Sequence, residues 1–197
     1  MATATAGQIR LLKIAVFLLA CFPLLRLVLL GLTDGLGTNP IEFITHSTGT
    51  WALVGLMLTL TVTPLRQLTG WNSLIRVRRL LGLFSFFYAS LHFITYIWLD
   101  QFFDVAAIIK DVYKRPFITV GFAAFLLLIP LAMTSSNAMI RRLGAKRWQM
   151  LHRLVYLIAI LGVLHYAWLV KKDLTQPLIY AAILTVLLGW RVLHQRR

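Results

Sequence analysis

The chain has 197 residues, of which 59% are apolar and only 13% charged, and its mean hydropathy is +0.80. An ordinary soluble domain is about 45–50% apolar and about 25% charged, so the composition excludes a soluble enzyme, a disordered chain and, with Cys21 as the single cysteine, a secreted disulfide scaffold. The formal charge of +14 comes from basic residues between apolar blocks, which indicates a membrane protein rather than a nucleic-acid-binding one.

Apolar segments of membrane-spanning length recur along the whole chain. A spanning helix needs roughly 20 mostly apolar residues, and the sequence predicts an all-α fold, a six-helix transmembrane bundle that forms a single domain over residues 1–197. The first segment is too long for a signal-peptide core and no A-x-A cleavage site follows it, so we expect it to be retained. The predicted spans are 14–32, 48–65, 80–99, 117–134, 151–170 and 178–192.

Turn-forming residues separate these spans. The string Gly-Leu-Gly-Thr-Asn-Pro at 35–40 follows the first span, and Pro64 is predicted to close the second. Pro116 is predicted to open the fourth span, and Gln176-Pro177 to precede the sixth. The connections are short, which leaves no room for a separate soluble domain.

Basic residues are distributed unevenly between the two sides of the predicted bundle. Fourteen Lys and Arg fall on the side that holds both termini, including Arg191, Arg196 and Arg197 of the tail. Because cytoplasmic loops carry the excess of Lys and Arg, both termini are predicted to be cytoplasmic. The net charge therefore reflects topology and does not indicate a polyanionic partner. The five basic residues of the opposite side are Lys110, Lys114, Arg115, Lys171 and Lys172.

Two histidines lie inside predicted spans at matched depth. His92 is seven residues from the outer end of the third span, about 10 Å, and His165 is five residues from the outer end of the fifth, about 8 Å. Two imidazoles from different helices can clamp a planar haem from both faces. The alternative is two unrelated histidines, each bonded to a carbonyl or hydroxyl. Arg26, in the first span, either snorkels outward or neutralises a propionate of that haem.

A second, incomplete centre is predicted near the cytoplasmic side. His152 precedes His165 by 13 residues, about 20 Å along a helix, although an ideal helix turns the two rings about 140° apart. Arg79 stands 13 residues before His92, where a partner for His152 would belong. Arginine cannot ligate iron, but it can bind a haem propionate, a flavin phosphate or a quinone carbonyl. The alternative for His152 is an interfacial side chain.

The other polar residues carry weaker signals. His46 opens the second span and is expected to be interfacial, with cofactor binding as the alternative, and Ser47 or Thr48 is expected to cap the helix. His194 lies in the basic tail and is predicted to be solvated. The basic and aromatic segment 71–79 could hold a flavin phosphate, but the positive-inside rule explains it equally well.

Together these residues resemble the MsrQ (YedZ) family, haem-binding membrane subunits within the ferric-reductase-like transmembrane domains. The resemblance implies haem b, one or two, held by His92, His152 and His165, and FMN, which no motif locates. The wider fold carries two histidines on each of two helices, and Arg79 replaces the fourth. The matching strings include His46-Ser-Thr-Gly, Ile75-Arg-Val-Arg-Arg-Leu-Leu-Gly-Leu, Leu91-His, Arg115-Pro, Leu131-Ala-Met-Thr-Ser, Trp148-Gln-Met-Leu-His-Arg-Leu-Val-Tyr and His165-Tyr-Ala-Trp.

The resemblance also implies a function. It predicts an electron conduit of the bacterial inner membrane, with no catalytic residue of its own, that takes electrons from the quinone pool or a cytosolic flavin reductase. The acceptor would be the periplasmic molybdoenzyme MsrP, its heterodimer partner, which reduces methionine sulfoxide, a reversible lesion of oxidised proteins. The outer segment 100–115 is predicted to form a short interfacial helix that docks MsrP or packs on membrane lipid.

Three other functions stay open at this point. The chain could be a quinol-linked cytochrome b of another ferric-reductase-like system. It could be a proton-relay transporter, although no inverted repeat or pair of broken helices is apparent. It could also be a structural anchor that only recruits a partner.

Overall fold

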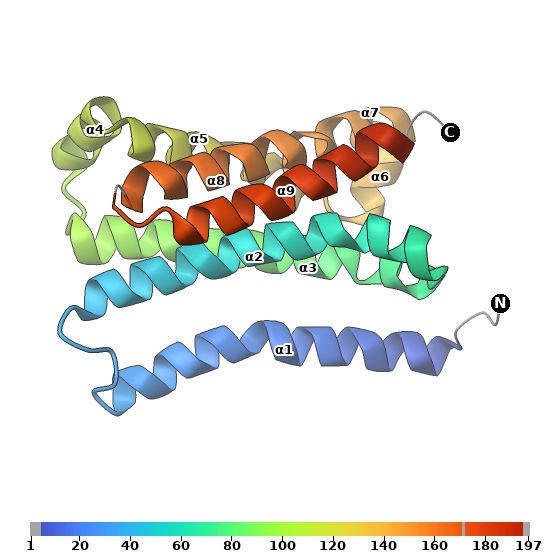
Figure 1. The fold of residues 1–197 in the computed structure, drawn as a ribbon, viewed down its shortest axis with the longest axis horizontal. Coiled ribbons are helices and arrows are strands. Elements are labelled where there is room, and N and C mark those ends of the chain that lie inside the picture. Colours follow the sequence, from blue (N-terminus) through green and yellow to red (C-terminus); the bar gives the residue numbers. More distant parts are fainter. Residues whose placement is uncertain (1–4, 171, 195–197) are drawn as a thin grey trace. The chain divides into compact units, whose positions relative to one another are not determined.

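The computed structural model describes residues 5–170 and 172–194, and the ordered elements within them are helices (Figure 1). Of the basic residues that underlie the predicted topology, Lys171, Arg196 and Arg197 lie outside this part of the chain. The helices are α1 (Ala6–Leu32), α2 (Pro40–Thr69), the 3₁₀ helix η1 (Asn72–Arg76), α3 (Arg78–Thr95), the π-helical η2 (Tyr96–Asp100), α4 (Val105–Lys114), α5 (Pro116–Met133), α6 (Asn137–Leu143), α7 (Ala145–His152), α8 (Leu154–Val170) and α9 (Thr175–His194).

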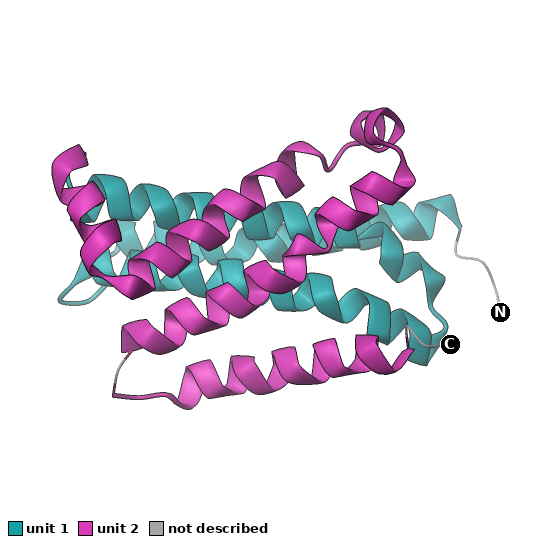
Figure 2. Cartoon of the chain, turned by 90° about the horizontal axis from the view of Figure 1, so that it is seen from above, with its two compact units in different colours: residues 1–103 teal, residues 104–197 magenta. Residues whose placement is uncertain are grey.

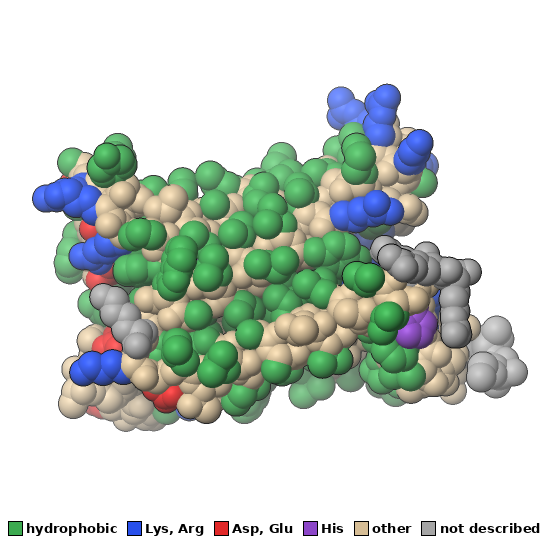
Figure 3. Space-filling model, turned by 45° about the horizontal axis from the view of Figure 1, so that its top comes forward, with side chains coloured by type: hydrophobic (Ala, Val, Ile, Leu, Met, Phe, Trp, Pro, Cys, Tyr) green, Lys and Arg blue, Asp and Glu red, His purple; other side chains and the backbone are tan. Residues whose placement is uncertain are grey.

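Six helical segments of the described chain are long and apolar enough to cross a membrane, which confirms the all-α, six-span prediction. Large apolar side chains such as Leu19 and Val186 are 72% and 69% exposed, as expected where lipid rather than water is the solvent. On the face in Figure 3, hydrophobic side chains cover the middle of the helices and charged ones lie at their ends. The chain is a multi-pass membrane protein.

Two predicted boundaries of the second span are wrong. Pro64 does not close it, because α2 continues through this residue to Thr69 and ends at Gly70, whose φ is 69°. In lipid, leaving the helix would expose unpaired backbone groups, so a proline is tolerated within it. Ser47 and Thr48 do not cap it either, because α2 begins two turns earlier, at Pro40, with Asn39 as its N-cap.

The other predicted prolines behave differently. Pro116 opens α5, as predicted, at a position where its missing N–H costs nothing. Pro177 does not precede the last helix but lies in its first turn, since α9 begins at Thr175. The first turn has no intrahelical donors to lose, so proline is compatible with it.

The chain forms two compact units, residues 1–103 and 104–197 (Figure 2), and the single-domain expectation stays a prediction. In the first unit, α2 packs closely against α3, and α1 lies beside this pair. In the second unit, α5 packs against α8, and α9 lies beside α8. Each unit therefore centres on one pair of adjacent spanning helices.

Small residues allow α2 and α3 to approach closely. The Ser85 hydroxyl donates to the Ala52 carbonyl at 2.7 Å, and a Cβ added at Gly55 would lie 3.0 Å from the Cβ of Ser85. Such small-residue contacts are typical of helix packing in membranes, where lipid and leucine are equally apolar. They fix α3 against α2 and thereby set the position of every side chain on that face.

A tyrosine fastens α1 to this pair at Pro23, inside α1. The Tyr88 hydroxyl of α3 donates to the Ala20 carbonyl at 2.6 Å and accepts the Leu24 N–H at 3.2 Å. An uninterrupted α-helix joins these two backbone groups directly, so the hydroxyl is inserted into the hydrogen-bond ladder of α1. Tyr88 is only 2% exposed. Proline and an inserted side chain are both recognised causes of a helix kink.

The fifth span has a local irregularity at Arg153. The last residue of α7 is His152 and α8 begins at Leu154, but Arg153 keeps helical backbone angles (φ −68°, ψ −20°) and its N–H donates to the Gln149 carbonyl at 3.1 Å. The two helices therefore make one spanning segment, Ala145–Val170, and the rotation expected between His152 and His165 stays a prediction.

Candidate functional site

His92 is held by α2 in the first unit. Its Nδ1 lies 2.9 Å from the Thr45 carbonyl oxygen. A carbonyl oxygen can only accept, so Nδ1 carries the proton, and in the neutral ring Nε2 carries the lone pair. Gly49, one turn further along α2, lies against the ring, since a Cβ added there would be 3.0 Å from Nδ1 and Cε1. The missing side chain is what lets the imidazole pack on the helix.

His165 is held by α5 in the second unit in the same way. Its Nδ1 donates to the Phe117 carbonyl at 2.7 Å, which again leaves the lone pair of the neutral ring on Nε2. A Cβ added at Gly121 would lie 2.7 Å from Nδ1, closer than real contacts allow. The Phe117 ring lies beside the imidazole, with ring centroids 6.3 Å apart.

The two histidines share one local arrangement. In each unit the residue whose carbonyl accepts the hydrogen bond stands four positions before the glycine. Because four residues make about one helical turn, the carbonyl and the glycine lie on the same face of the helix, against the ring. A hydrogen bond from one ring nitrogen to a backbone carbonyl is the usual way in which a metal-binding histidine is oriented and made more basic. Both rings are thus prepared to ligate a metal through Nε2.

The donor set fits haem better than a metal bound by protein alone. No group of three or more His, Cys, Asp or Glu side chains gathers as a metal site within residues 5–170 and 172–194. A porphyrin supplies four ligands to its iron and needs only axial ligands from the protein, and imidazole is a usual one. The tautomers of His92 and His165 suit that role.

His152 is engaged differently. Its Nε2 lies 2.9 Å from the Thr134 hydroxyl, which itself donates to the Pro130 carbonyl at 2.6 Å. The single hydroxyl proton is thereby used, so Nε2 must be the donor and the lone pair of the neutral ring is on Nδ1. Trp148 stacks on the imidazole with centroids 3.9 Å apart, and its indole N–H donates to the Thr134 carbonyl. His152 thus joins α7 to the end of α5.

The remaining candidates lie at the surface of their units. Arg79 is exposed in the first turn of α3. Arg26 is exposed, with its guanidinium over the Phe43 ring at 5.8 Å, an arrangement that suits snorkelling. His46 is exposed in the second turn of α2, and His194 is exposed and stacked on Trp190.

Sequence reasoning missed Gly49 and Gly121. Both occur in apolar helices where a glycine is unremarkable, and only the packed helix pairs show what each contacts. A usable signal is present nonetheless: each glycine precedes its histidine by nearly the same number of residues, 43 and 44.

Comparison with known proteins identifies the family to which the chain belongs. Residues 48–163 match the family model described as ferric reductase like transmembrane component, which gives the class of membrane protein. The chain is 61% identical to the protein-methionine-sulfoxide reductase heme-binding subunit MsrQ of Herminiimonas arsenicoxydans, over 94% of this chain and 86% of that protein. It is 57% identical to the MsrQ of Azospira oryzae, over 98% and 83%, and 52% identical to that of Bordetella pertussis, over 95% and 92%. The chain belongs to the MsrQ family of ferric-reductase-like membrane proteins.

Proposed function

We propose that this chain is the haem-binding electron-transfer subunit of a methionine sulfoxide reductase system, with His92 and His165 as axial ligands of a haem b. The observation that carries the proposal is the way each ring is held, with Nδ1 bonded to a carbonyl and a glycine beneath it. The names of the relatives, which call them heme-binding subunits, support it independently.

The residues around each histidine would prepare it for this role. When bound, haem supplies a reversible one-electron iron couple within the membrane. The carbonyls of Thr45 and Phe117 hold the proton on Nδ1, which leaves the lone pair of each neutral ring on Nε2. Gly49 and Gly121 leave room for the rings. That both rings serve one iron rests on their matched positions in the sequence.

The direction of electron flow is part of the proposal. Electrons would come from the quinone pool or a cytosolic flavin reductase, with FMN as a second cofactor, and would leave at the periplasmic face of the inner membrane to MsrP. The excess of Lys and Arg on the side of both termini supports the orientation. The relatives' membership of a methionine sulfoxide reductase supports a catalytic partner.

We also propose a second haem at His152, with Arg79 as a partner for one of its propionates. Binding iron through Nε2 would require His152 to release the Thr134 hydroxyl, and binding through Nδ1 would leave that bond in place. The stacked Trp148 supports a structural role for the ring in joining α7 to α5. Arg26 and His46 are proposed as propionate partners only if a haem edge reaches them.

We propose α4 as the surface that meets MsrP. A helix forms within segment 100–115, at Val105–Lys114. Val105, Ile109 and Tyr113 recur every four residues along it and are 65%, 65% and 87% exposed. Ile109→Glu should lower electron delivery to MsrP several-fold without changing haem content, measured as methionine sulfoxide turnover. If delivery is unchanged while the protein separates more easily from lipid, the helix packs on the membrane instead.

The absorbance spectrum of the protein purified in mild detergent tests the haem proposal. Wild-type protein should show a Soret band that shifts on reduction, and His92→Ala or His165→Ala should remove it. His194→Ala is the matched control and should leave the spectrum unchanged. Correctly folded but colourless wild-type protein would contradict the proposal and favour a proton-relay transporter or an anchor.

A further inference from the structure

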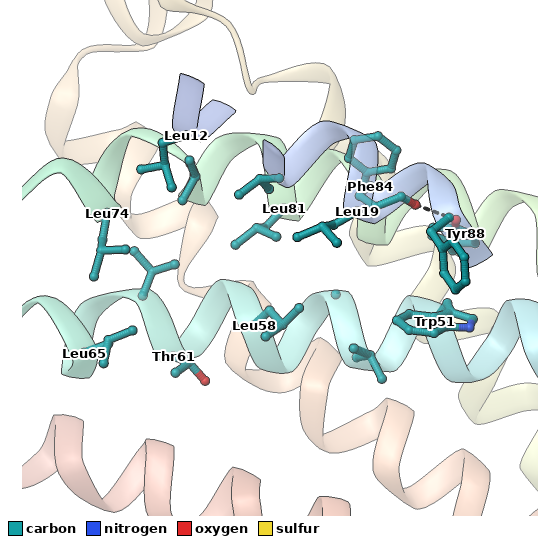
Figure 4. A pocket seen from close by; sticks show the side chains of 17 residues that line it. Leu12, Leu19, Trp51, Leu58, Thr61, Leu65, Leu74, Leu81, Phe84 and Tyr88 are labelled. Carbon is teal, nitrogen blue, oxygen red and sulfur yellow. Dashed lines mark hydrogen bonds between the residues drawn. The ribbon is translucent and has the colours of Figure 1, made fainter. Parts of the chain in front are cut away.

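An apolar cavity lies within the first unit, between α1 and the α2–α3 pair (Figure 4). Its volume is about 440 Å³, and 17 side chains line it. Polar atoms are few and mostly engaged. The Thr61 hydroxyl donates to the Met57 carbonyl of its own helix, and the Tyr88 hydroxyl is inserted into α1. The cavity therefore offers a ligand almost nothing but hydrocarbon contact.

The shape of the cavity suits one linear chain. Its lining on α2 extends from Trp51 to Leu65, a rise of about 21 Å. A lining of this length, made almost wholly of apolar side chains, matches an extended hydrocarbon chain. Since the hydrocarbon core of a bilayer is about 30 Å thick, one leaflet is about 15 Å deep. A complete acyl chain fits within the cavity.

Basic residues adjoin, in the sequence, the residues that line one end of the cavity. Figure 4 shows Leu12, Leu65 and Leu74 together at that end, away from Trp51 and Tyr88. The acidic residues of the first unit, Asp34, Glu42 and Asp100, all lie at the opposite ends of the helices. Three cations adjoin the lining residues in sequence: Lys13 follows Leu12, Arg66 follows Leu65, and Arg76 lies between Leu74 and Val77.

We propose that this cavity binds one acyl chain of an anionic glycerophospholipid, with the phosphate at Lys13, Arg66 and Arg76. Basic sites beside spanning helices are a recurrent means of binding anionic headgroups. A neutral amphiphile such as a quinone would occupy the apolar part but would gain less from the three cations, because a carbonyl carries no net charge for them to neutralise. The lipid lies between α1 and its neighbours and completes their packing.

Native mass spectrometry of the full chain in mild detergent tests the apolar part. Wild-type protein should retain one phospholipid, and Leu58→Trp, which fills the cavity from α2, should lower the retained fraction at least tenfold. Leu29→Trp is the control, since Leu29 is similarly exposed (52% against 47%) but does not line the cavity. Equal retention by the two variants would overturn the proposal, as would a quinone in place of the phospholipid.

A photoactivatable phosphatidylglycerol with a diazirine in its acyl chain tests the site without altering its lining. In vesicles, cross-links to wild-type protein should concentrate on segments 12–22, 51–65 and 74–88, which line the cavity, and Lys13→Gln with Arg66→Gln should reduce them several-fold. The same probe with a phosphatidylcholine headgroup should react less with wild-type protein and be insensitive to the two substitutions. Cross-links elsewhere, or no headgroup preference, would overturn the proposal, whether or not the tryptophan variants fold.

Discussion

At the scale of single residues, the hydrogen bonds of the histidines distinguish their roles better than their depth does. His92 and His165 donate through Nδ1 to a carbonyl, whereas His152 donates through Nε2 to a hydroxyl. The first pattern presents Nε2 as a metal ligand, and the second uses Nε2 to join two helices. Three histidines that look alike in the sequence thus have two different environments.

Gly121 tests whether the support of His165 matters for cofactor binding. Gly121→Ala would place a Cβ 2.7 Å from Nδ1 and displace the ring from the Phe117 carbonyl, so the haem-to-protein ratio should fall several-fold. Gly189→Ala is the control, because a Cβ there meets nothing within 4 Å. Equal haem content in both variants would show that the ring does not depend on this contact. Gly49→Ala, with a gap of 3.0 Å, should have a smaller effect.

Thr134 tests the structural role of His152. Thr134→Val keeps the shape of the side chain but removes the hydroxyl that accepts from His152 and donates to Pro130. Thr134 is 8% exposed, so leaving its partners unsatisfied should lower the free energy of unfolding by about 1–3 kcal/mol. Thermal unfolding in detergent measures this. Ser136→Ala, at an exposed helix cap, should cost about 1 kcal/mol or less.

The candidate ligands were predictable from the sequence, but their support was not. A histidine in an apolar run is conspicuous by composition, because a polar side chain is costly in lipid. The supporting residues have no such signature, because a backbone carbonyl accepts the hydrogen bond and a missing side chain makes room for the ring. These residues are Thr45, Gly49, Phe117 and Gly121. Their roles follow from which helices pack together.

At the scale of elements, spans were easier to predict than their ends. The length of an apolar run identifies the part of a helix that lies in the hydrocarbon core of the bilayer, but capping residues decide where the helix begins and ends. In α1 the Thr5–Gln8 capping box begins the helix at Ala6, eight residues before the predicted span. In α2, Asn39 and Gly70 extend the helix beyond the predicted 48–65 at both ends. Six spans were right, and all but the fourth were predicted too short.

Tyr88 tests how α1 is held. Tyr88→Phe removes the hydroxyl between the Ala20 carbonyl and the Leu24 N–H, and should lower the free energy of unfolding by about 1–3 kcal/mol. The Leu24 amide should also exchange its hydrogen faster. Tyr113→Phe, at an 87% exposed position of α4, should change neither quantity. Unchanged exchange at Leu24 in the Tyr88 variant would mean that this bond contributes nothing to the attachment.

At the scale of the whole molecule, the charge distribution predicts the orientation in the membrane. In a Cys21→Ser background, Thr38→Cys lies between α1 and α2 and should react with an impermeant maleimide in intact cells. Ser135→Cys lies between α5 and α6 and should react only after permeabilisation. The reverse pattern would place both termini outside and would contradict the proposed direction of electron flow.

The attachment of α1 has a consequence for biosynthesis. Ala20 and Leu24 leave the ribosome 68 and 64 residues before the tyrosine that bridges them. Until α3 is made, the Ala20 carbonyl and the Leu24 N–H have only each other as partners, so the first helix can enter the bilayer with this bond closed. The insertion of the Tyr88 hydroxyl between them is therefore a late step, and nascent chains that stop before Tyr88 should carry a straighter first helix than the complete protein.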